Sequence, residues 1–233
     1  FFIDSNKLTG VISISSERDR IEAKLERANL STVTSDGMGN KNLMSFIKKL
    51  RAMNKLPLIQ FYCDNLLLNK NTFKKVYLEL LPRTYGYEIM NFSVTNDNIM
   101  LQAQGQWQMD NKAVTILSGN AYTQNFGKVL AEYGRANSMS RGSGEMNFSL
   151  KWDGDLLDFD LLKIYGSAHF DLRAGSLINV EPGLGRVIGL LSLDTIQRRL
   201  QLDFSDLLNR GFVFDKFVAD LKFAPGDITS DNI

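Results

Sequence analysis

Residues 101–109 read Leu101-Gln102-Ala103-Gln104-Gly105-Gln106-Trp107-Gln108-Met109, a stretch in which apolar or small residues alternate with glutamines. Successive side chains of a β-strand point to opposite faces, so this stretch predicts a strand with one apolar face and one hydrated face. Two-faced strands are typical of antiparallel sheets, because the strands of parallel sheets are buried on both faces and read as continuous apolar runs. The stretch therefore favours a mainly β fold built on an antiparallel sheet.

The same alternation recurs toward the C-terminus and extends the predicted sheet well beyond this strand. Its apolar positions are Met146, Phe148, Leu150 and Trp152, then Ala168, Phe170, Leu172 and Ala174, and finally Phe217, Ala219, Leu221 and Phe223. Turn-forming residues such as Asp153-Gly154 separate the strand-like runs. We predict strands over 7–15, 18–30, 57–68, 73–81, 86–95, 98–109, 112–122, 140–152, 158–175 with a break, 212–224 and 227–233, joined as a long curled meander.

Three segments interrupt the β pattern and predict one substantial and two short helices. Within 35–55, Leu43, Phe46, Ile47 and Leu50 recur at helical spacing, and residues 124–135 form a second short helical stretch. The longest stretch runs over 183–197, where Leu184, Val187, Ile188 and Leu191 form one apolar stripe. We expect this helix to cap one end of the sheet.

The composition excludes several classes of protein. The 233 residues are 44% hydrophobic and carry a net charge of +1, whereas nucleic-acid-binding proteins usually have an excess of Lys and Arg. A single cysteine, Cys63, and a single histidine, His169, are too few for a disulfide framework or a Cys/His zinc site. We therefore expect no nucleic-acid partner, no metal, no cofactor and no enzymatic activity.

Two local patterns resemble ligand sites but fit structural roles better. The run from Gly183 to Gly189 resembles a dinucleotide-binding loop, yet that loop must follow a parallel strand in a βαβ unit. Asp153, Asp155, Asp158 and Asp160 lack the spacing of a calcium loop and predict a turn with solvated carboxylates. Cys63 alternates with Phe61 and Ile59, which predicts a core position.

A sheet with one persistently apolar face must bury that face against a second layer or bind something there. The predicted helices are few for so many strands, so the sheet either packs on itself or leaves an open apolar groove, for which an acyl chain is the natural occupant. The candidate groove residues are Leu101, Ala103, Trp107, Met109, Met146, Phe148, Leu150, Trp152, Phe170, Leu172, Phe217, Leu221 and Phe223.

A family resemblance becomes visible near the C-terminus. Gly183 to Leu193, then Arg198-Arg199-Leu200-Gln201-Leu202-Asp203-Phe204-Ser205-Asp206, then Gly211-Phe212-Val213-Phe214-Asp215 follow one another in a linked order. Upstream come Leu56-Pro57, Gly105-x-Trp107, Thr115 to Gly119, Leu150 to Gly154, and Gly166. Together these motifs resemble the C-terminal region of the YhdP branch of AsmA-like envelope proteins, over about residues 56–233.

The resemblance implies a β-rich periplasmic body with a taco-like hydrophobic groove, anchored in the inner membrane by an N-terminal helix that is absent from this stretch. It also implies a phospholipid conduit between the inner and outer membranes that supports the outer-membrane barrier, with acyl chains as partners and no catalytic residues. On this basis we divide the chain into strands continuing a sheet from a preceding part (1–34), a linker with a short helix (35–55) and a C-terminal groove domain (56–233).

One alternative stays open on the sequence. A fully packed sheet with exposed strand edges would instead be a non-enzymatic scaffold that docks an outer-membrane or periplasmic protein partner. A hydrolase is a more distant alternative.

Overall fold

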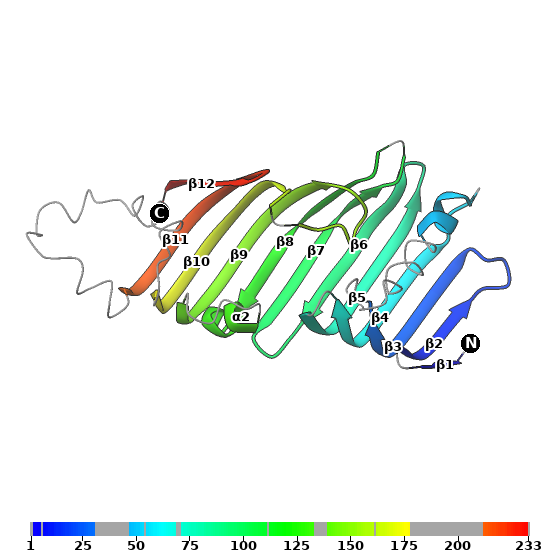
Figure 1. Ribbon diagram of the computed structural model, residues 1–233, viewed down its shortest axis with the longest axis horizontal. Coiled ribbons are helices and arrows are strands. Elements are labelled where there is room, and N and C mark those ends of the chain that lie inside the picture. The colour runs from blue at the N-terminus through cyan, green and yellow to red at the C-terminus, as the bar shows by residue number, and fades with distance from the viewer. Residues whose placement is uncertain are drawn as a thin grey trace, which may run out of the picture. The chain divides into compact units, whose positions relative to one another are not determined.

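The computed structural model describes residues 2–5, 7–30, 47–53, 55–68, 71–110, 112–132, 139–160, 162–177 and 212–232 (Figure 1). These residues form twelve strands and confirm a mostly β fold. The strands are β1 (Phe2–Asp4), β2 (Leu8–Ile14), β3 (Arg20–Asn29), β4 (Leu58–Leu68), β5 (Asn71–Arg83), β6 (Gly86–Thr95), β7 (Ile99–Gln108), β8 (Val114–Thr123), β9 (Met139–Asp153), β10 (Tyr165–Leu177), β11 (Phe212–Ala224) and β12 (Asp227–Asn232).

The chain divides into two compact units. Unit 1 comprises residues 1–117 and 153–159, and unit 2 comprises residues 118–152 and 160–233, so that β8 runs from one unit into the other. Within each unit the strands are neighbours in chain order. The strand β1 has β2 as its one described neighbour, and β12 has β11.

Among the described strand pairs with a defined register, all but one are antiparallel, as a meander requires. β3 and β4 are parallel, with Ile21 opposite Ile59 and Leu25 opposite Cys63. Parallel neighbours need a long crossover in place of a hairpin, and the stretch between Asn29 and Leu58 provides it. The prediction of an antiparallel sheet was therefore wrong for the pair β3 and β4, and the sheet of unit 1 is mixed.

The described helices are both short. Residues 47–51 are helical, with Ile47 and Leu50 buried, and α2 spans Phe126–Glu132, where Gly127 and Val129 are buried. The Asn125 side chain accepts a hydrogen bond from the backbone N–H of Lys128 and caps the start of α2. The predicted helix over 183–197 lies outside the described residues.

In each unit, one row of cross-strand neighbours on three adjacent strands interrupts the alternation of side chains. Beyond this row, the residues that face the apolar side are shifted by one position in the sequence. In unit 1 the row contains Asp64 and Lys75, and Lys75 has a φ of 45°. In unit 2 it contains Gly142 and Ala174, and Ala174 has a φ of 54°. Without this shift the strands would turn their apolar residues to the opposite face beyond the row.

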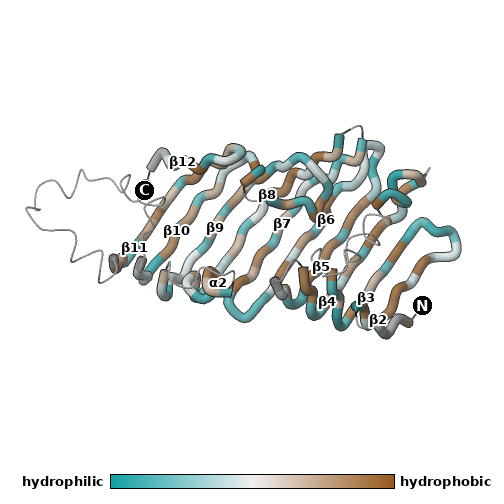
Figure 2. Tube along the Cα trace, in the orientation of Figure 1, coloured by the Kyte–Doolittle hydropathy of each residue, from teal (hydrophilic) through white to brown (hydrophobic). Residues whose placement is uncertain are grey.

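In the core of unit 1, the apolar side chains lie on the same face of the sheet before and beyond this row. Leu25, Cys63 and Val76 lie before the shifted row, Ala28 and Leu66 lie beyond it, and all belong to one buried cluster. Figure 2 shows the resulting bands of hydrophobic residues along β4 to β7. One face of the unit 1 sheet is therefore continuously apolar.

Candidate functional site

Eight of the predicted groove residues lie on one face of three neighbouring strands in unit 2. The register of β9, β10 and β11 places them in four rows: Leu150–Gly166–Phe223, Phe148–Ala168–Leu221, Met146–Phe170–Ala219 and Gly144–Leu172–Phe217. Side chains directly opposite one another in antiparallel strands are in contact range. The rows therefore form one contiguous apolar surface, which we call the unit 2 face.

The residues of the unit 2 face are buried to different degrees. Phe148 and Leu172 are buried, whereas Met146, Leu150, Phe170, Phe217, Leu221 and Phe223 are half-buried. Near Leu172, α2 contributes Phe126 and Leu130 to a cluster with Met139 and Phe214. Trp152 follows Leu150 on the same face of β9 and is buried. Most of the large side chains on this face thus keep part of their surface accessible.

In unit 1 the predicted residues of β7 lie beside apolar residues of β6. Leu101 is opposite Val94, Ala103 is opposite Phe92, and Trp107 is opposite Tyr87. The rings of Tyr87 and Trp107 are stacked with centroids 5.7 Å apart. Trp107 is only 4% exposed, so its surroundings within unit 1 are almost entirely protein.

The indole of Trp107 takes part in a buried polar contact that the sequence did not reveal. Its Nε1–H donates to Asp155 Oδ1 at 3.0 Å, and Arg51 Nη2 donates to the same oxygen at 2.6 Å. Asp155 is 6% exposed, and a buried carboxylate requires such partners. Asp155 therefore links the helix at 47–51 to the end of β7, and its predicted solvated position was wrong.

The segment that carries Asp155 is held on unit 1 by further hydrogen bonds. Gly154 donates its backbone N–H to Ala113 O, and the Thr115 hydroxyl donates to Gly154 O at 3.1 Å. Asp158 accepts a hydrogen bond from the backbone N–H of Asp155 at 2.8 Å. These bonds explain the turn at residues 154–158, although a strand was predicted to begin at 158, and β10 begins only at Tyr165.

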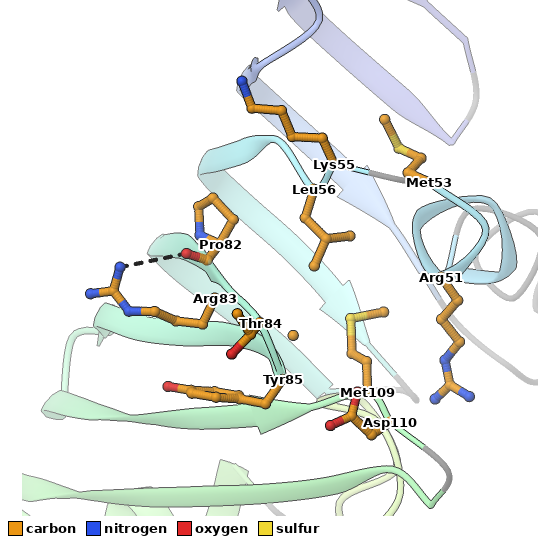
Figure 3. A pocket seen from close by; sticks show the side chains of 11 residues that line it. Arg51, Met53, Lys55, Leu56, Pro82, Arg83, Thr84, Tyr85, Met109 and Asp110 are labelled. Carbon is orange, nitrogen blue, oxygen red and sulfur yellow. Dashed lines mark hydrogen bonds between the residues drawn. The ribbon is translucent and has the colours of Figure 1, made fainter.

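A pocket of about 680 Å³ lies in unit 1 beside the turn between β5 and β6. Its charged lining residues are Arg51, Lys55, Arg83 and Asp110, and its apolar lining includes Met53, Leu56, Pro82 and the predicted residue Met109. Figure 3 shows the side chains of Leu56 and Met109 directed toward each other, with Lys55 and Arg83 extending outward around them. The pocket thus combines an apolar centre with charged surroundings.

Potentially reactive groups are dispersed in the described part of the chain. Cys63 is fully buried, as predicted, and burial raises the pKa of its thiol. Burial also raises the pKa of Tyr87, whose hydroxyl has no hydrogen-bond partner among the described residues. His169 is exposed and its Nδ1 lies 2.6 Å from Asp220 Oδ1.

Within the described ranges, no group of three or more His, Cys, Asp or Glu residues could hold a metal ion. No helix of the described residues has the length and apolar character needed to span a membrane. The predicted capping residues Leu184, Val187, Ile188 and Leu191 lie outside the described residues, so their role stays a prediction.

The geometry of each unit defines a class of protein: mostly antiparallel strands that place their apolar residues on one face, with isolated polar contacts. The chain belongs to the YhdP protein family, which matches it over residues 1–233. This confirms the resemblance found in the sequence and extends it to the N-terminal strands.

A curated relative is similar over part of the chain. It is the intermembrane phospholipid transporter YhdP of Escherichia coli (strain K12), 25% identical over 134 residues. The similar region covers 57% of this chain and 11% of that protein, so the chain corresponds to a small part of its relative. No solved structure matches the chain.

Proposed function

We propose that this chain is a segment of a phospholipid-transporting envelope protein and that acyl chains lie against the unit 2 face. The observation that carries the proposal is the alignment of Leu150, Phe170 and Phe223 with their neighbours in four apolar rows whose large side chains remain half-buried. Half-buried apolar rows are favourable contacts for methylene groups, each worth about 0.8 kcal/mol when removed from water.

Family membership and the name of the E. coli relative support the same proposal. We further propose that the segment lies in the periplasm, that a helix N-terminal to it anchors the full-length protein in the inner membrane, and that its transport activity supports the outer-membrane barrier. Transport of this kind uses apolar contact and needs no bond-breaking chemistry, so the segment is proposed to be non-enzymatic.

Site-specific photocrosslinking tests the proposal with controls that the strands themselves provide. Benzoylphenylalanine replaces Leu150 or Phe223, which lie on the unit 2 face, or their neighbours Ser149 and Lys222, which point to the opposite face. After irradiation in the cell envelope, we expect phospholipid adducts, detected by mass spectrometry, at Leu150 and Phe223 but not at Ser149 and Lys222.

Other outcomes of the same experiment contradict the conduit. Equal lipid adducts at all four positions would indicate nonspecific contact with membranes. Protein adducts at Leu150 and Phe223, without lipid, would favour the scaffold alternative, in which this face docks an envelope protein.

A further inference from the structure

The pocket in unit 1 has a composition that differs from the unit 2 face. Arg51, Lys55 and Arg83 are long cationic side chains around an apolar centre made by Leu56 and Met109. By contrast, the rows of the unit 2 face contain only apolar residues and glycine. A cavity with cations around apolar groups matches a molecule that has an anionic part and an apolar part.

The two arginines are oriented by carboxylates while keeping further donors. Arg51 uses Nη2 for the buried Asp155, and Arg83 uses Nη2 for Glu88 and Nη1 for the backbone oxygen of Pro82. A guanidinium has five N–H groups in a planar fork, which suits bidentate binding of a phosphate. Asp155 fixes the position of Arg51, because the Asp155 carboxylate is itself held in place by a hydrogen bond from Trp107. Arg51 therefore reaches the pocket in a defined position.

The charge balance indicates what kind of anion fits. Arg51 and Arg83 are each paired with a carboxylate, and the lining also contains one carboxylate, Asp110, for the remaining cation Lys55. These three cations and three carboxylates sum to no net charge, so a free phosphate ion is not strongly attracted by the field alone. Binding requires apolar contact with Leu56 and Met109 in addition, which an amphiphile supplies and a free ion does not.

We propose that this pocket binds the phosphate group of an anionic phospholipid, with its glycerol and first methylenes against Leu56 and Met109. The inference rests on the proposed function and adds a head-group site to it. Without an excess of positive charge the binding is weak, which suits a ligand that must leave again.

Methyl NMR on the whole chain tests this site, because methionine methyl groups report from both units. Met53 and Met109 line the pocket, and Met146 lies on the unit 2 face. The ligands are dihexanoyl phosphatidylglycerol, dihexanoylglycerol with the same acyl chains but no phosphate, and inorganic phosphate. We expect the phosphatidylglycerol to shift the Met53 and Met109 signals at concentrations where the other two ligands leave them unchanged.

A charge-removing variant makes the test specific. In Lys55→Gln/Arg83→Gln, we expect the Kd of the phosphatidylglycerol measured at Met109 to rise about tenfold, because two charge-assisted contacts are lost. The control Lys128→Gln/Lys151→Gln removes the same charge from exposed positions of unit 2 and is expected to leave this Kd unchanged.

The outcomes separate this inference from the proposed function. If both lipids shift Met146 while Met109 is unaffected or does not distinguish them, the head-group site is refuted and the conduit stands. If inorganic phosphate alone shifts Met109 as strongly, the pocket is a simple anion site and the lipid assignment is wrong. If no ligand shifts any methionine signal, the proposed function fails as well.

Discussion

Compared strand by strand, unit 1 and unit 2 place apolar residues on one face by the same alternation but enclose them differently. On the apolar face of unit 1, which we call the unit 1 face, Ile59, Leu80 and Ile89 share one row and are all buried, and Cys63 and Val76 lie opposite each other and are buried as well. Between them lies a half-buried row, Phe61–Leu78–Phe92. On the unit 2 face, Phe170, Phe217 and Phe223 are only half-buried. The alternation of a strand therefore determines which residues share a face, not how far that face is closed.

Residue type accounts for part of this difference. The buried rows of unit 1 contain β-branched and short aliphatic side chains, which pack closely on a pleated surface, whereas the half-buried row between them contains Phe61 and Phe92. The unit 2 rows are rich in phenylalanine, and they contain glycine at Gly144 and Gly166, as the Ile89 row of unit 1 does at Gly105. A Cβ at Gly166 would lie 2.0 Å from Ser149 O, so this position must remain glycine. We infer that the buried rows of unit 1 contribute more to stability, and that the half-buried rows of unit 2 are the ones accessible to the proposed lipid contact.

The strongest test of this comparison introduces a carboxylate into each face. Leu25→Asp in unit 1 is expected to reduce the free energy of unfolding by about 4 kcal/mol or more, because Leu25 is 4% exposed and the charge would be buried without a partner. Leu221→Asp in unit 2 is expected to cost only about 1–2 kcal/mol, because Leu221 is half-buried and the carboxylate keeps part of its hydration. Urea denaturation measures both values.

The same two variants also test function. Leu221→Asp is expected to fold and to reduce the amount of phospholipid that co-purifies with the protein, as measured by native mass spectrometry. If Leu221→Asp unfolds as completely as Leu25→Asp, the unit 2 face is a closed core and the comparison fails.

The second prediction concerns the buried carboxylate of Asp155, which accepts hydrogen bonds from Trp107 and Arg51 in unit 1. Asp155→Ala is expected to reduce the free energy of unfolding by about 2–3 kcal/mol, because Trp107 loses its acceptor and Arg51 loses its partner. Asp153→Ala, two residues away, removes an exposed ion pair with Lys112 at 2.8 Å and is expected to cost less than about 1 kcal/mol. Thermal and urea unfolding of the matched pair measure the difference.

Tryptophan fluorescence gives a second measurement on the Asp155 variant. Loss of the buried carboxylate beside the indole of Trp107 is expected to shift the emission maximum of the folded protein, whereas Asp153→Ala leaves it unchanged. Equal stability of the two variants would show that Asp155 does not hold the helix at 47–51 in place.

The sequence predicted the strands well because their signal is local. The alternation over 101–109 is enough to define β7 and its apolar face, and most predicted strand ends fall within three residues of the observed ones. The short strand β1 was missed, since three residues carry no periodicity. The parallel pairing of β3 with β4 was also missed, because strand direction depends on the path of the crossover and not on the residues of either strand.

The polar contact at Asp155 could not be predicted for a different reason. Arg51 and Asp155 are 104 positions apart, and the acidic composition around Asp155 is the usual signature of a solvated turn. The nearest available signal was Trp107 on an apolar face, because a buried indole N–H needs an acceptor. That signal predicts some acceptor but does not identify which residue supplies it.

The smallest expected effect concerns Cys63, which reports on how tightly the unit 1 face is closed. Burial raises the pKa of its thiol in the folded state above the value of an unfolded chain, about 8.5. The folded protein then binds this proton more tightly than the unfolded chain, so the stabilising contribution is complete below about pH 8.5 and is lost as the pH rises toward the folded pKa.

We therefore compare wild-type protein with Cys63→Ser by urea denaturation between pH 7 and 9.5. At pH 7 the variant is expected to be about 1 kcal/mol less stable, since a hydroxyl replaces a thiol in an apolar site. This gap should narrow as the pH rises, because only the wild type loses a thiol contribution, while the raised pKa of Tyr87 affects both proteins equally. A gap that stays constant up to pH 9.5 would mean that the thiol titrates alike in the folded and unfolded chains, and that the unit 1 face admits water at Cys63 much as the unit 2 face does at Leu221.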